Sequence, residues 1–428
     1  MTVSDILVLG ATGTTGKLVA RYLHGHKSRS SFTLALGARS TSKLDAVYKE
    51  LSLPDTVKKV QVDVTNDKSI EEAVKGARVV INTVGPFWRW GTPVVAACAK
   101  NGVHYVDCTA EAPWITEIIP QFDFLATKTG AIILPACGLD CIPSDLAVFI
   151  SNQTLKAVSS DLDIDTSVSA YNVRMGLSGG TVASLVSMTD EVPTSKFIRA
   201  TKDYICSPVT GKDKWSPKIL YRLPRVTPTV WGAVWHMGLS NRSMIQRTWG
   251  LHELAATQEA GEEGKKLRYG PEFKYDEFHI KANPITAILF TLGFAVGFGF
   301  IALLKPVRWL LRTFGESMAG PSEETMRKGL LEVTNITTSV ATPSQPAVHV
   351  RTFLRGKGDP GFLVTSVLLS ETALTVALDE KKLPALGRKG GILTTASACG
   401  QLLVDRLKDS GWFDIESRVL EEGEDGRS

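Results

Sequence analysis

Short apolar-rich runs alternate with segments of helical periodicity over the first 150 residues. The runs lie at residues 6–9, 32–36, 60–63, 79–84, 104–107 and 131–134, a pattern typical of strands buried on both faces of a parallel sheet. Between them, apolar positions recur at helical spacing in residues 17–23, 41–51, 69–75 and 92–101. This alternation predicts right-handed crossovers and an α/β fold built on a doubly wound parallel sheet.

The pattern changes after residue 150. Polar and apolar positions alternate over residues 162–173, and further strands are predicted at 331–340, 347–354 and 363–370. Helices are predicted at 181–190, 371–379 and 395–409. Strands of period two among helices predict a second α+β domain with a mixed sheet, one face of which is partly solvated. Residues 205–280 are rich in Trp, Pro and Arg and match neither period.

These changes divide the chain into three parts. We expect a nucleotide-binding domain at residues 1–150, and a substrate or dimerisation domain formed by residues 151–280 together with 320–428. Residues 281–315 form an apolar segment whose centre, residues 285–304, carries no charge over twenty positions. The basic and aromatic residues around this centre are typical of anchoring at a membrane interface: Lys281, Lys305, Arg308, Trp309 and Arg312.

The apolar segment is long enough to cross a membrane. A crossing would separate residues 162–190 from residues 331–407, although both are expected in one sheet, and a sheet cannot be assembled across a bilayer. We therefore favour an anchor helix or hairpin that inserts into one side of a membrane or lipid-droplet surface, with glycines that permit a bend: Gly293, Gly297 and Gly299. Burial in the protein core, or a lid over an acyl channel, is the alternative.

Composition narrows the class of protein. The chain has 428 residues, and its net charge of +4 (48 basic minus 44 acidic) is too dilute for a nucleic-acid partner. Six cysteines are too few for a disulfide framework and indicate an intracellular, reducing compartment. No signal peptide is expected, because the first apolar run leads directly into a glycine-rich turn. Cys137 and Cys141 have no second pair of Cys or His, so we expect no metal site.

A glycine-rich loop, GATGTTG at residues 10–16, joins the first strand to the first helix. Gly10 suits a tight turn, Gly13 lets the backbone approach a pyrophosphate, and Gly16 permits close packing of helix against strand. The helix N-terminus supplies N–H groups for phosphate. This context predicts a Rossmann-like dinucleotide site, with a merely structural turn as the alternative. Its expected cofactor-binding residues are Gly10, Thr12, Gly13, Thr14, Thr15 and Gly16.

The ends of the following strands indicate which dinucleotide binds. The second strand ends at Arg39 and Ser40 with no carboxylate, which favours the 2′-phosphate of NADP over the free ribose of NAD, although a solvated arginine is the alternative. Asp63 follows the third strand and could meet the adenine or cap a helix. The turn after the fourth strand would let a nicotinamide lie close, through Val84, Gly85 and Pro86.

Five polar residues near the ends of later strands could donate or relay a proton. Tyr105, Asp107 and Glu111 lie at and just after the fifth strand, and Asp140 and Asp145 lie in the loop after the sixth. Ligands bind at this edge of open α/β sheets. Asp145, after Pro143 and Ser144, is equally an ordinary acidic residue at a helix N-terminus.

Several strings together resemble the saccharopine dehydrogenase-like oxidoreductases. They are the glycine loop, Gly85-Pro86-Phe87, Tyr105-Val106-Asp107 with Glu111, the string GLDCIPSD at residues 138–145, SGGT at 178–181, GDPG at 358–361, and Gly390-Gly391 with Thr394 and Thr395. The similarity runs nearly end to end, and it is strongest to the branch that contains trans-acting enoyl reductases and lipid-droplet-associated homologues. Family members usually carry Gly at position 110, Ser at 141 and Pro at 395, where this chain has Ala, Cys and Thr.

This resemblance implies an NADP-dependent oxidoreductase that reduces a lipid-like enoyl or carbonyl acyl substrate at a membrane or lipid-droplet surface facing the cytosol. A homodimer is a possible assembly. One alternative is a droplet- or membrane-associated protein that keeps the fold without catalysis. A second is true saccharopine dehydrogenase chemistry, which needs a site for two amino-acid carboxylates, to which Arg174 and Arg222 could contribute.

Overall fold

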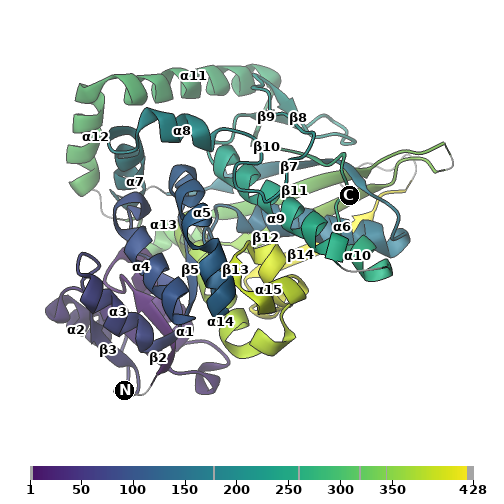
Figure 1. Ribbon diagram of the computed structural model, residues 1–428. Coiled ribbons are helices and arrows are strands. Elements are labelled where there is room, and N and C mark those ends of the chain that lie inside the picture. The colour runs from purple at the N-terminus through teal and green to yellow at the C-terminus, as the bar shows by residue number, and fades with distance from the viewer. Residues whose placement is uncertain (1–2, 177–178, 259–260, 318–319, 344, 422–428) are drawn as a thin grey trace.

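The computed structural model describes residues 3–421 except 177–178, 259–260, 318–319 and 344, and without the side chains of Glu263 and residues 314–317. Ser178 of the SGGT string therefore lies outside the described residues. The chain forms two seven-stranded sheets, here named sheet A and sheet C, which lie in the two halves of the molecule (Figure 1).

Sheet A is parallel and follows the order β13-β6-β5-β4-β1-β2-β3. Its strands are β1 (Ser4–Leu9), β2 (Leu34–Ala38), β3 (Lys58–Gln61), β4 (Ala77–Asn82), β5 (His104–Asp107), β6 (Ile132–Leu134) and β13 (Gly391–Ile392). Ile6 and Val8 pack into one core and Leu7 and Leu9 into another, which explains the unbroken apolar run of β1. The predicted doubly wound α/β sheet is confirmed, with the order of a dinucleotide-binding fold.

Helices cover both faces of this sheet. They are α1 (Thr14–His24), α2 (Thr41–Glu50), α3 (Asp67–Lys75), α4 (Phe87–Asn101), α5 (Ala112–Thr129) and α6 (Ile142–Val158), with a 3₁₀ turn η1 (Arg29–Ser31). Local caps set several boundaries. The side chains of Ser40 and Asn66 accept the N–H groups of Lys43 and Ser69, and α4 ends at Gly102 in the left-handed conformation.

Sheet C is mixed and follows the order β14-β12-β11-β7-β10-β9-β8, in which only the β7–β10 pair is parallel. Its strands are β7 (Ile164–Arg174), β8 (Tyr221–Arg222), β9 (Trp231–Ala233), β10 (Lys274–Lys281), β11 (Leu330–Ser339), β12 (His349–Lys357) and β14 (Phe413–Val419). The predicted second α+β fold with a mixed sheet is confirmed.

The polar positions of β7 do not face solvent. Ser167 and Ser169 are fully buried, and both accept hydrogen bonds from Nδ2 of Asn335 on β11, at 2.8 and 3.0 Å. The expectation of a partly solvated face is therefore wrong for these two serines. Alternation along a strand shows only that the two faces differ, and here the polar face satisfies its hydrogen bonds within the protein.

The remaining helices follow β7 along the chain. They are α7 (Gly179–Asp190), α8 (Thr194–Ala200), α9 (Gly238–Gln258), α10 (Glu262–Leu267), α11 (Pro284–Leu303), α12 (Lys305–Ser317), α13 (Glu323–Arg327), α14 (Thr365–Asp379), α15 (Ala385–Lys389), α16 (Thr395–Ala398) and α17 (Gln401–Asp409), with η2 (Pro360–Val364) and η3 (Glu380–Lys382).

The predicted strand at 363–370 is wrong, because these residues form the end of η2 and the start of α14. A short apolar run that is buried on every side carries no period that separates strand from helix. The predicted helix at 395–409 divides into α16 and α17, because Gly400 between them has φ +53°.

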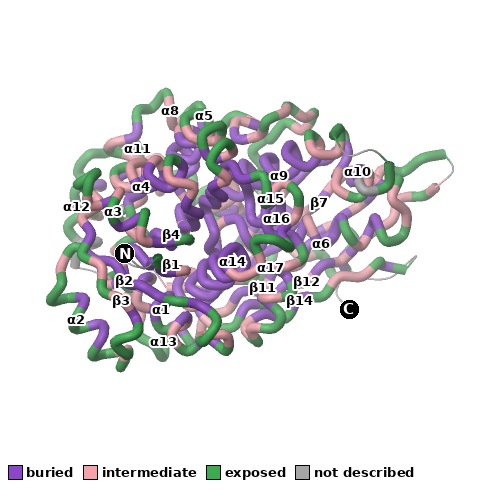
Figure 2. Tube along the Cα trace, turned by 60° about the horizontal axis from the view of Figure 1, so that its bottom comes forward, coloured by how far each residue is buried: buried purple, intermediate pink, exposed green. Residues whose placement is uncertain are grey.

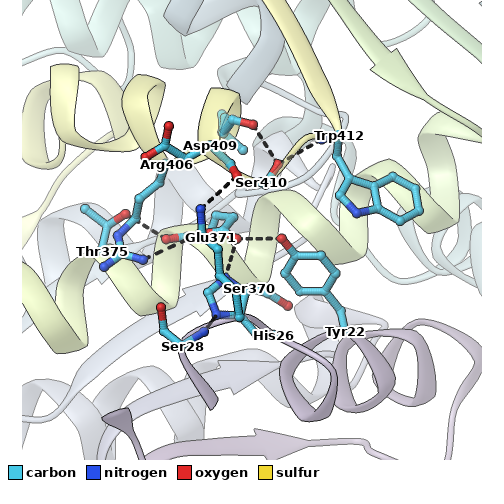
Figure 3. A network of polar contacts seen from close by, with 12 residues as sticks. Tyr22, His26, Ser28, Ser370, Glu371, Thr375, Arg406, Asp409, Ser410 and Trp412 are labelled. Carbon is cyan, nitrogen blue, oxygen red and sulfur yellow. Dashed lines mark hydrogen bonds and ion pairs between the residues drawn. The ribbon is translucent and has the colours of Figure 1, made fainter. Parts of the chain in front are cut away.

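The C-terminal part of the chain packs against sheet A. β13 pairs with β6, and α14 lies against α1, β1, β4 and β5, where it is almost wholly buried (Figure 2). At this junction the buried carboxylate of Glu371 accepts the hydroxyl of Tyr22 at 2.5 Å and contacts Nε2 of His26 at 3.0 Å, and Arg406 lies 3.7 Å away (Figure 3). This polar cluster connects α1, which follows the glycine loop, to α14 and α17.

The apolar segment forms α11, which lies along one side of the molecule (Figure 1). A capping box at Asn283 starts the helix, and α12 follows it directly. Because β10 and β11 both pair with β7, the α11–α12 connection leaves sheet C and returns to it. The described residues include two helical stretches long and apolar enough to cross a membrane, of which residues 360–382 are mostly buried, whereas α11 is mostly exposed.

Candidate dinucleotide site and active site

The glycine loop lies at the carboxyl edge of sheet A, between β1 and α1. Gly10 has φ +82°, and a Cβ at Gly16 would lie 2.1 Å from the carbonyl oxygen of Gly10, so both positions require glycine. Gly13 differs, because its added Cβ would approach only the Gly10 carbonyl oxygen, at 3.4 Å. Gly13 is the N-cap of α1 and gives no side-chain cap, which leaves the first N–H groups of the helix open to an anion.

The hydroxyl-bearing residues of this loop differ in exposure. Thr12 and Thr15 are partly buried, and Thr14 is exposed. A Cβ at Gly320, which precedes α13, would lie 3.1 Å from Cγ2 of Thr14, so Gly320 lies beside the loop. The loop has the shape and the open N–H groups that a pyrophosphate requires, so a dinucleotide fits here.

The second strand end is open to solvent. Arg39 is exposed after β2, and Ser40 caps α2 through its hydroxyl. The carboxylate of Asp63 accepts the N–H and the hydroxyl of Thr65, at 2.9 and 2.8 Å, and these bonds lower the pKa of Asp63. Asp63 therefore shapes its own loop, and the charge of Arg39 also lowers the pKa of this carboxylate.

The turn after β4 lies beside the glycine loop. A Cβ at Gly10 would meet Thr83 Oγ1 at 2.7 Å and Val84 Cγ2 at 3.0 Å, and Gly85 precedes Pro86 in a cis peptide. The buried carboxylate of Glu111 accepts the N–H groups of Phe87 and Trp88, at 2.9 and 2.7 Å. Both oxygens of Glu111 thus cap α4 and hold this turn in place.

Tyr105 and Asp107 form a buried cluster under the same edge. The Tyr105 hydroxyl donates to Asp107 Oδ2 at 2.7 Å, and Asp107 Oδ1 accepts the N–H groups of Thr109 and Ala136 at 2.9 Å each. Both side chains have no exposed surface, and burial raises the pKa of Asp107 to about 7. Their contacts hold the loops after β5 and β6 together.

Asp145 is likewise engaged in structure. Its carboxylate accepts the hydroxyl of Thr248 at 2.5 Å and the N–H of Ala396 at 3.0 Å. Burial raises its pKa to about 6, against these hydrogen bonds. The residue connects α6, α9 and α16, and its position in the first turn of α6 suits the helix dipole.

Asp140 differs from the other four predicted proton donors. It is partly buried, and its Oδ1 atom is buried without a hydrogen-bond partner among the described residues. Burial, and after it the charge of Glu277, raises its pKa to about 7. Glu277 was not predicted, because it lies within residues 205–280, where the sequence shows no clear period. The residues that follow it in β10, Phe278 and His279, form no recognisable catalytic motif with it.

All six cysteines are free. Among the residues that the structure describes, no three His, Cys, Asp or Glu side chains gather as a metal site would require. Arg174 and Arg222 are both exposed and lie on β7 and β8, which are separated by β10 and β9, so they form no paired site for two carboxylates.

The sequence of residues 6–134 matches the family model of the saccharopine dehydrogenase NADP binding domain. Over 429 residues the chain is 30% identical to the trans-acting enoyl reductase of Mycobacterium tuberculosis strain H37Rv, covering 95% of this chain and 96% of that protein. The protein of that name from Mycobacterium ulcerans is 29% identical with the same coverage. The chain belongs to the trans-acting enoyl reductase family.

This enoyl reductase family member also has the fold of a solved saccharopine dehydrogenase. The L-Glu-forming enzyme from Saccharomyces cerevisiae superposes with a TM-score of 0.50 at 14% identity, covering 98% of this chain and all of that one. The predicted membership of the saccharopine dehydrogenase-like oxidoreductases, with an NAD(P)-binding domain, is therefore confirmed.

Proposed function

We propose that the protein is an NADPH-dependent reductase that acts on an enoyl or carbonyl group of a lipid-like acyl substrate at a membrane or lipid-droplet surface. The observation that carries this proposal is the loop around Gly13, where an uncapped helix N-terminus meets open space at the carboxyl edge of a 3-2-1-4-5-6 sheet. When bound, the nicotinamide supplies a hydride.

The residues of this chain bind and orient the two reactants. The N–H groups after Gly13 would hold the pyrophosphate, and the turn at Val84, Gly85 and Pro86, held by Glu111, would border the nicotinamide. Ser184 on α7 lies beside this turn, because a Cβ at Gly85 would be 3.8 Å from its Oγ. Helix α7 thereby helps to exclude water from the face where the hydride is transferred.

Arg39 is the basis for preferring NADPH. An exposed guanidinium at the end of β2 can bind the 2′-phosphate in a bidentate manner, and no carboxylate stands there to bind a free ribose. We expect Arg39→Ala to weaken NADPH binding by about 10- to 100-fold, since a charge-assisted hydrogen bond contributes about 1.5–3 kcal/mol. NADH binding should stay unchanged. Quenching of protein fluorescence by each nucleotide measures both.

Lys49→Ala supplies the matched control for Arg39→Ala, because it removes a cation from the exposed C-terminal turn of α2. It should leave both affinities unchanged. Equal weakening of NADPH by the two variants would show only a general effect of positive charge and would contradict the assignment of Arg39.

The surface of α11 supports a lipid partner. Its exposed apolar side chains are Ile285, Leu289, Phe290, Leu292, Phe294, Val296, Phe300 and Leu303, and Leu304, Trp309 and Leu310 continue this surface. Nothing charged interrupts the helix. Arg308 and Arg312 instead pair with Asp190 on α7, so α12 is anchored to the protein while α11 presents its apolar side outward. Such a helix suits one leaflet or a droplet monolayer.

We expect the double variant Leu289→Glu, Leu303→Glu to reduce binding to phosphatidylcholine vesicles at least tenfold in a flotation assay. The two leucines are 64% and 81% exposed, so their replacement should not lower the melting temperature. Burying each leucine in lipid contributes about 1.5–3 kcal/mol. Phe124→Glu is the control, because Phe124 is 74% exposed on α5. If the double variant floats with the vesicles as much as the Phe124→Glu control does, α11 is not the lipid contact.

The decisive test combines binding and turnover. The purified protein in detergent is titrated with NADPH and NADH, and then mixed with NADPH and trans-2-dodecenoyl-coenzyme A. Micromolar NADPH binding with oxidation of NADPH on adding the thioester supports the reductase. Binding without oxidation of NADPH by any enoyl or carbonyl probe indicates the catalytically silent alternative, and turnover of saccharopine would indicate lysine-pathway chemistry.

A further inference from the structure

We propose that Asp140 donates the proton that completes the reduction, and that Glu277 is a positioning residue that keeps the Asp140 carboxyl protonated. This inference rests on the proposed reductase function. It concerns the loop after β6, residues 135–141, and the strand β10 of sheet C.

The loop that holds Asp140 borders the expected nicotinamide position. Asp107, at the end of β5, accepts the N–H of Ala136 through Oδ1 at 2.9 Å and the N–H of Cys137 through its carbonyl at 2.6 Å. β5 pairs with β4, whose following turn lies beside Gly10. In this sheet order the nicotinamide half of a dinucleotide lies beyond β1, on the side of β4 and β5. Asp140 follows the next strand along the same edge.

Sheet C forms the opposite side of the expected nicotinamide position. Glu277 on β10 is 5% exposed, and its carboxylate accepts the hydroxyls of Tyr275 and Ser144 at 2.7 Å each and Nδ2 of Asn241 at 2.9 Å. Oδ1 of Asn241 accepts the N–H of Cys141 at 2.8 Å. The network therefore joins Glu277, through Asn241, to the residue after Asp140 and holds the two carboxyl groups in one region.

The Asp140 side chain is left ready for a ligand. Its buried Oδ1 has no partner among the described residues, whereas the other predicted proton donors are engaged in hydrogen bonds. An unpaired buried polar atom costs about 1–3 kcal/mol. The backbone on both sides is strained as well, with φ +60° at Ala136 and +79° at Cys141. Strain and unpaired polar atoms that a fold retains are concentrated at functional sites.

The charges around the pair favour one retained proton. Burial raises the pKa of both Asp140 and Glu277 to about 7, and their mutual repulsion opposes ionisation of the second. The other titratable groups that face them are Asp276, Tyr275, Tyr171, Tyr221, Cys108 and Cys141. The thiols and phenols among these groups are neutral at pH 7, because burial raises their pKa.

The reaction balances with one proton from this carboxyl group. The β-carbon of the enoyl thioester would accept a hydride, with both its electrons, which a bound nicotinamide would supply. The electron pair of the carbon–carbon π bond moves to the α-carbon, which forms a C–H bond as the O–H bond of Asp140 breaks. Asp140 is left as a carboxylate and regains a proton from solvent. One NADPH and one proton are thus consumed for each double bond reduced.

The test is Asp140→Asn, assayed with NADPH and trans-2-dodecenoyl-coenzyme A. We expect kcat to fall by about 100-fold or more, as for loss of a general acid, with NADPH affinity and melting temperature unchanged. In the wild type a donor must be protonated, so kcat/KM should be level below pH 7 and fall tenfold for each pH unit above it. This fall should be absent from Asp140→Asn.

Glu277→Gln distinguishes an effect of Glu277 on the protonation of Asp140 from a merely structural role of Glu277. Loss of the Glu277 charge lowers the pKa of Asp140, so the fall in kcat/KM should move to lower pH, which a purely structural residue would not cause. Asp165→Asn on β7 is the control, because its carboxylate pairs with Lys274 at 2.9 Å, and it should leave the pH profile unchanged. Infrared titration of the protein without nucleotide should show carboxyl absorbance lost near pH 7, and this loss should be smaller in Asp140→Asn, in which Asp107 and Glu277 still titrate there.

The outcomes distinguish two failures. A wild type that reduces the thioester, with an Asp140→Asn variant of equal rate and an unchanged pH profile, overturns the proton-donor assignment alone. A wild type that binds NADPH but reduces no enoyl or carbonyl probe overturns the proposed function and this assignment with it.

Discussion

Gly13→Val is expected to abolish NADPH binding while the protein stays folded. Gly13 has φ −80° and ψ 166°, which valine adopts readily, and a Cβ there meets only one atom, at 3.4 Å. The isopropyl group would occupy the space in front of the α1 N-terminus, where the pyrophosphate must lie. We expect affinity to fall at least 100-fold in fluorescence titration, and loss of the glycine N-cap to cost about 1 kcal/mol of stability at most.

Gly16→Ala provides the contrasting control three residues away. Its single methyl group would lie 2.1 Å from a backbone oxygen and 2.9 Å from the Cα of Ala11, so the loop itself must move. We expect this smaller change to lower the melting temperature strongly, whereas Gly13→Val lowers it little. Retention of NADPH binding by a folded Gly13→Val protein would place the cofactor elsewhere and contradict the site.

Glu371→Ala is expected to destabilise the protein more than other single carboxylate changes outside the active site. The substitution leaves the Tyr22 hydroxyl, the His26 ring and the Arg406 guanidinium without their common partner in a buried place (Figure 3). Removing one member of a buried charged cluster costs about 3–5 kcal/mol. Thermal denaturation followed by circular dichroism should show a fall in melting temperature of about 3–6 °C.

Glu380→Ala tests whether burial of the Glu371 cluster is the cause of the expected loss of stability. The side chain of Glu380 is 47% exposed and lies 3.3 Å from Arg78, and exposed ion pairs contribute about 0–1 kcal/mol. Its melting temperature should stay within about 2 °C of the wild type. Equal falls for the two variants would show that the Glu371 cluster adds nothing beyond an ordinary surface pair.

Local patterns predicted sheet A well. Strand β5 spans the predicted residues 104–107, and β1 extends two residues before its predicted start. A glycine marks one end of each run, Gly10 after β1 and Gly102 before β5. The glycine loop and its place before α1 were equally readable, because the chemistry of a phosphate site lies within seven consecutive residues.

Contacts between segments far apart in the chain could not be predicted from the sequence in the same way. Helix α9 is buried along most of its length and contains polar residues such as Asn241, Arg242 and Gln246, so no apolar stripe marks it. The importance of Glu277 depends on Ser144, 133 positions earlier in the chain. No single segment of sequence carries that pairing, because the fold alone brings the two elements together.

The position of β13 and α14 bears on how the protein is made. Sheet A receives its last strand from residues 391–392 and one of its covering helices from residues 365–379, although its first strand begins at residue 4. During synthesis the nucleotide-binding half therefore leaves the ribosome with an uncovered apolar face and waits for most of the chain to emerge. We expect nascent chains stalled before residue 365 to recruit chaperones, and a fragment of residues 1–150 expressed alone to aggregate.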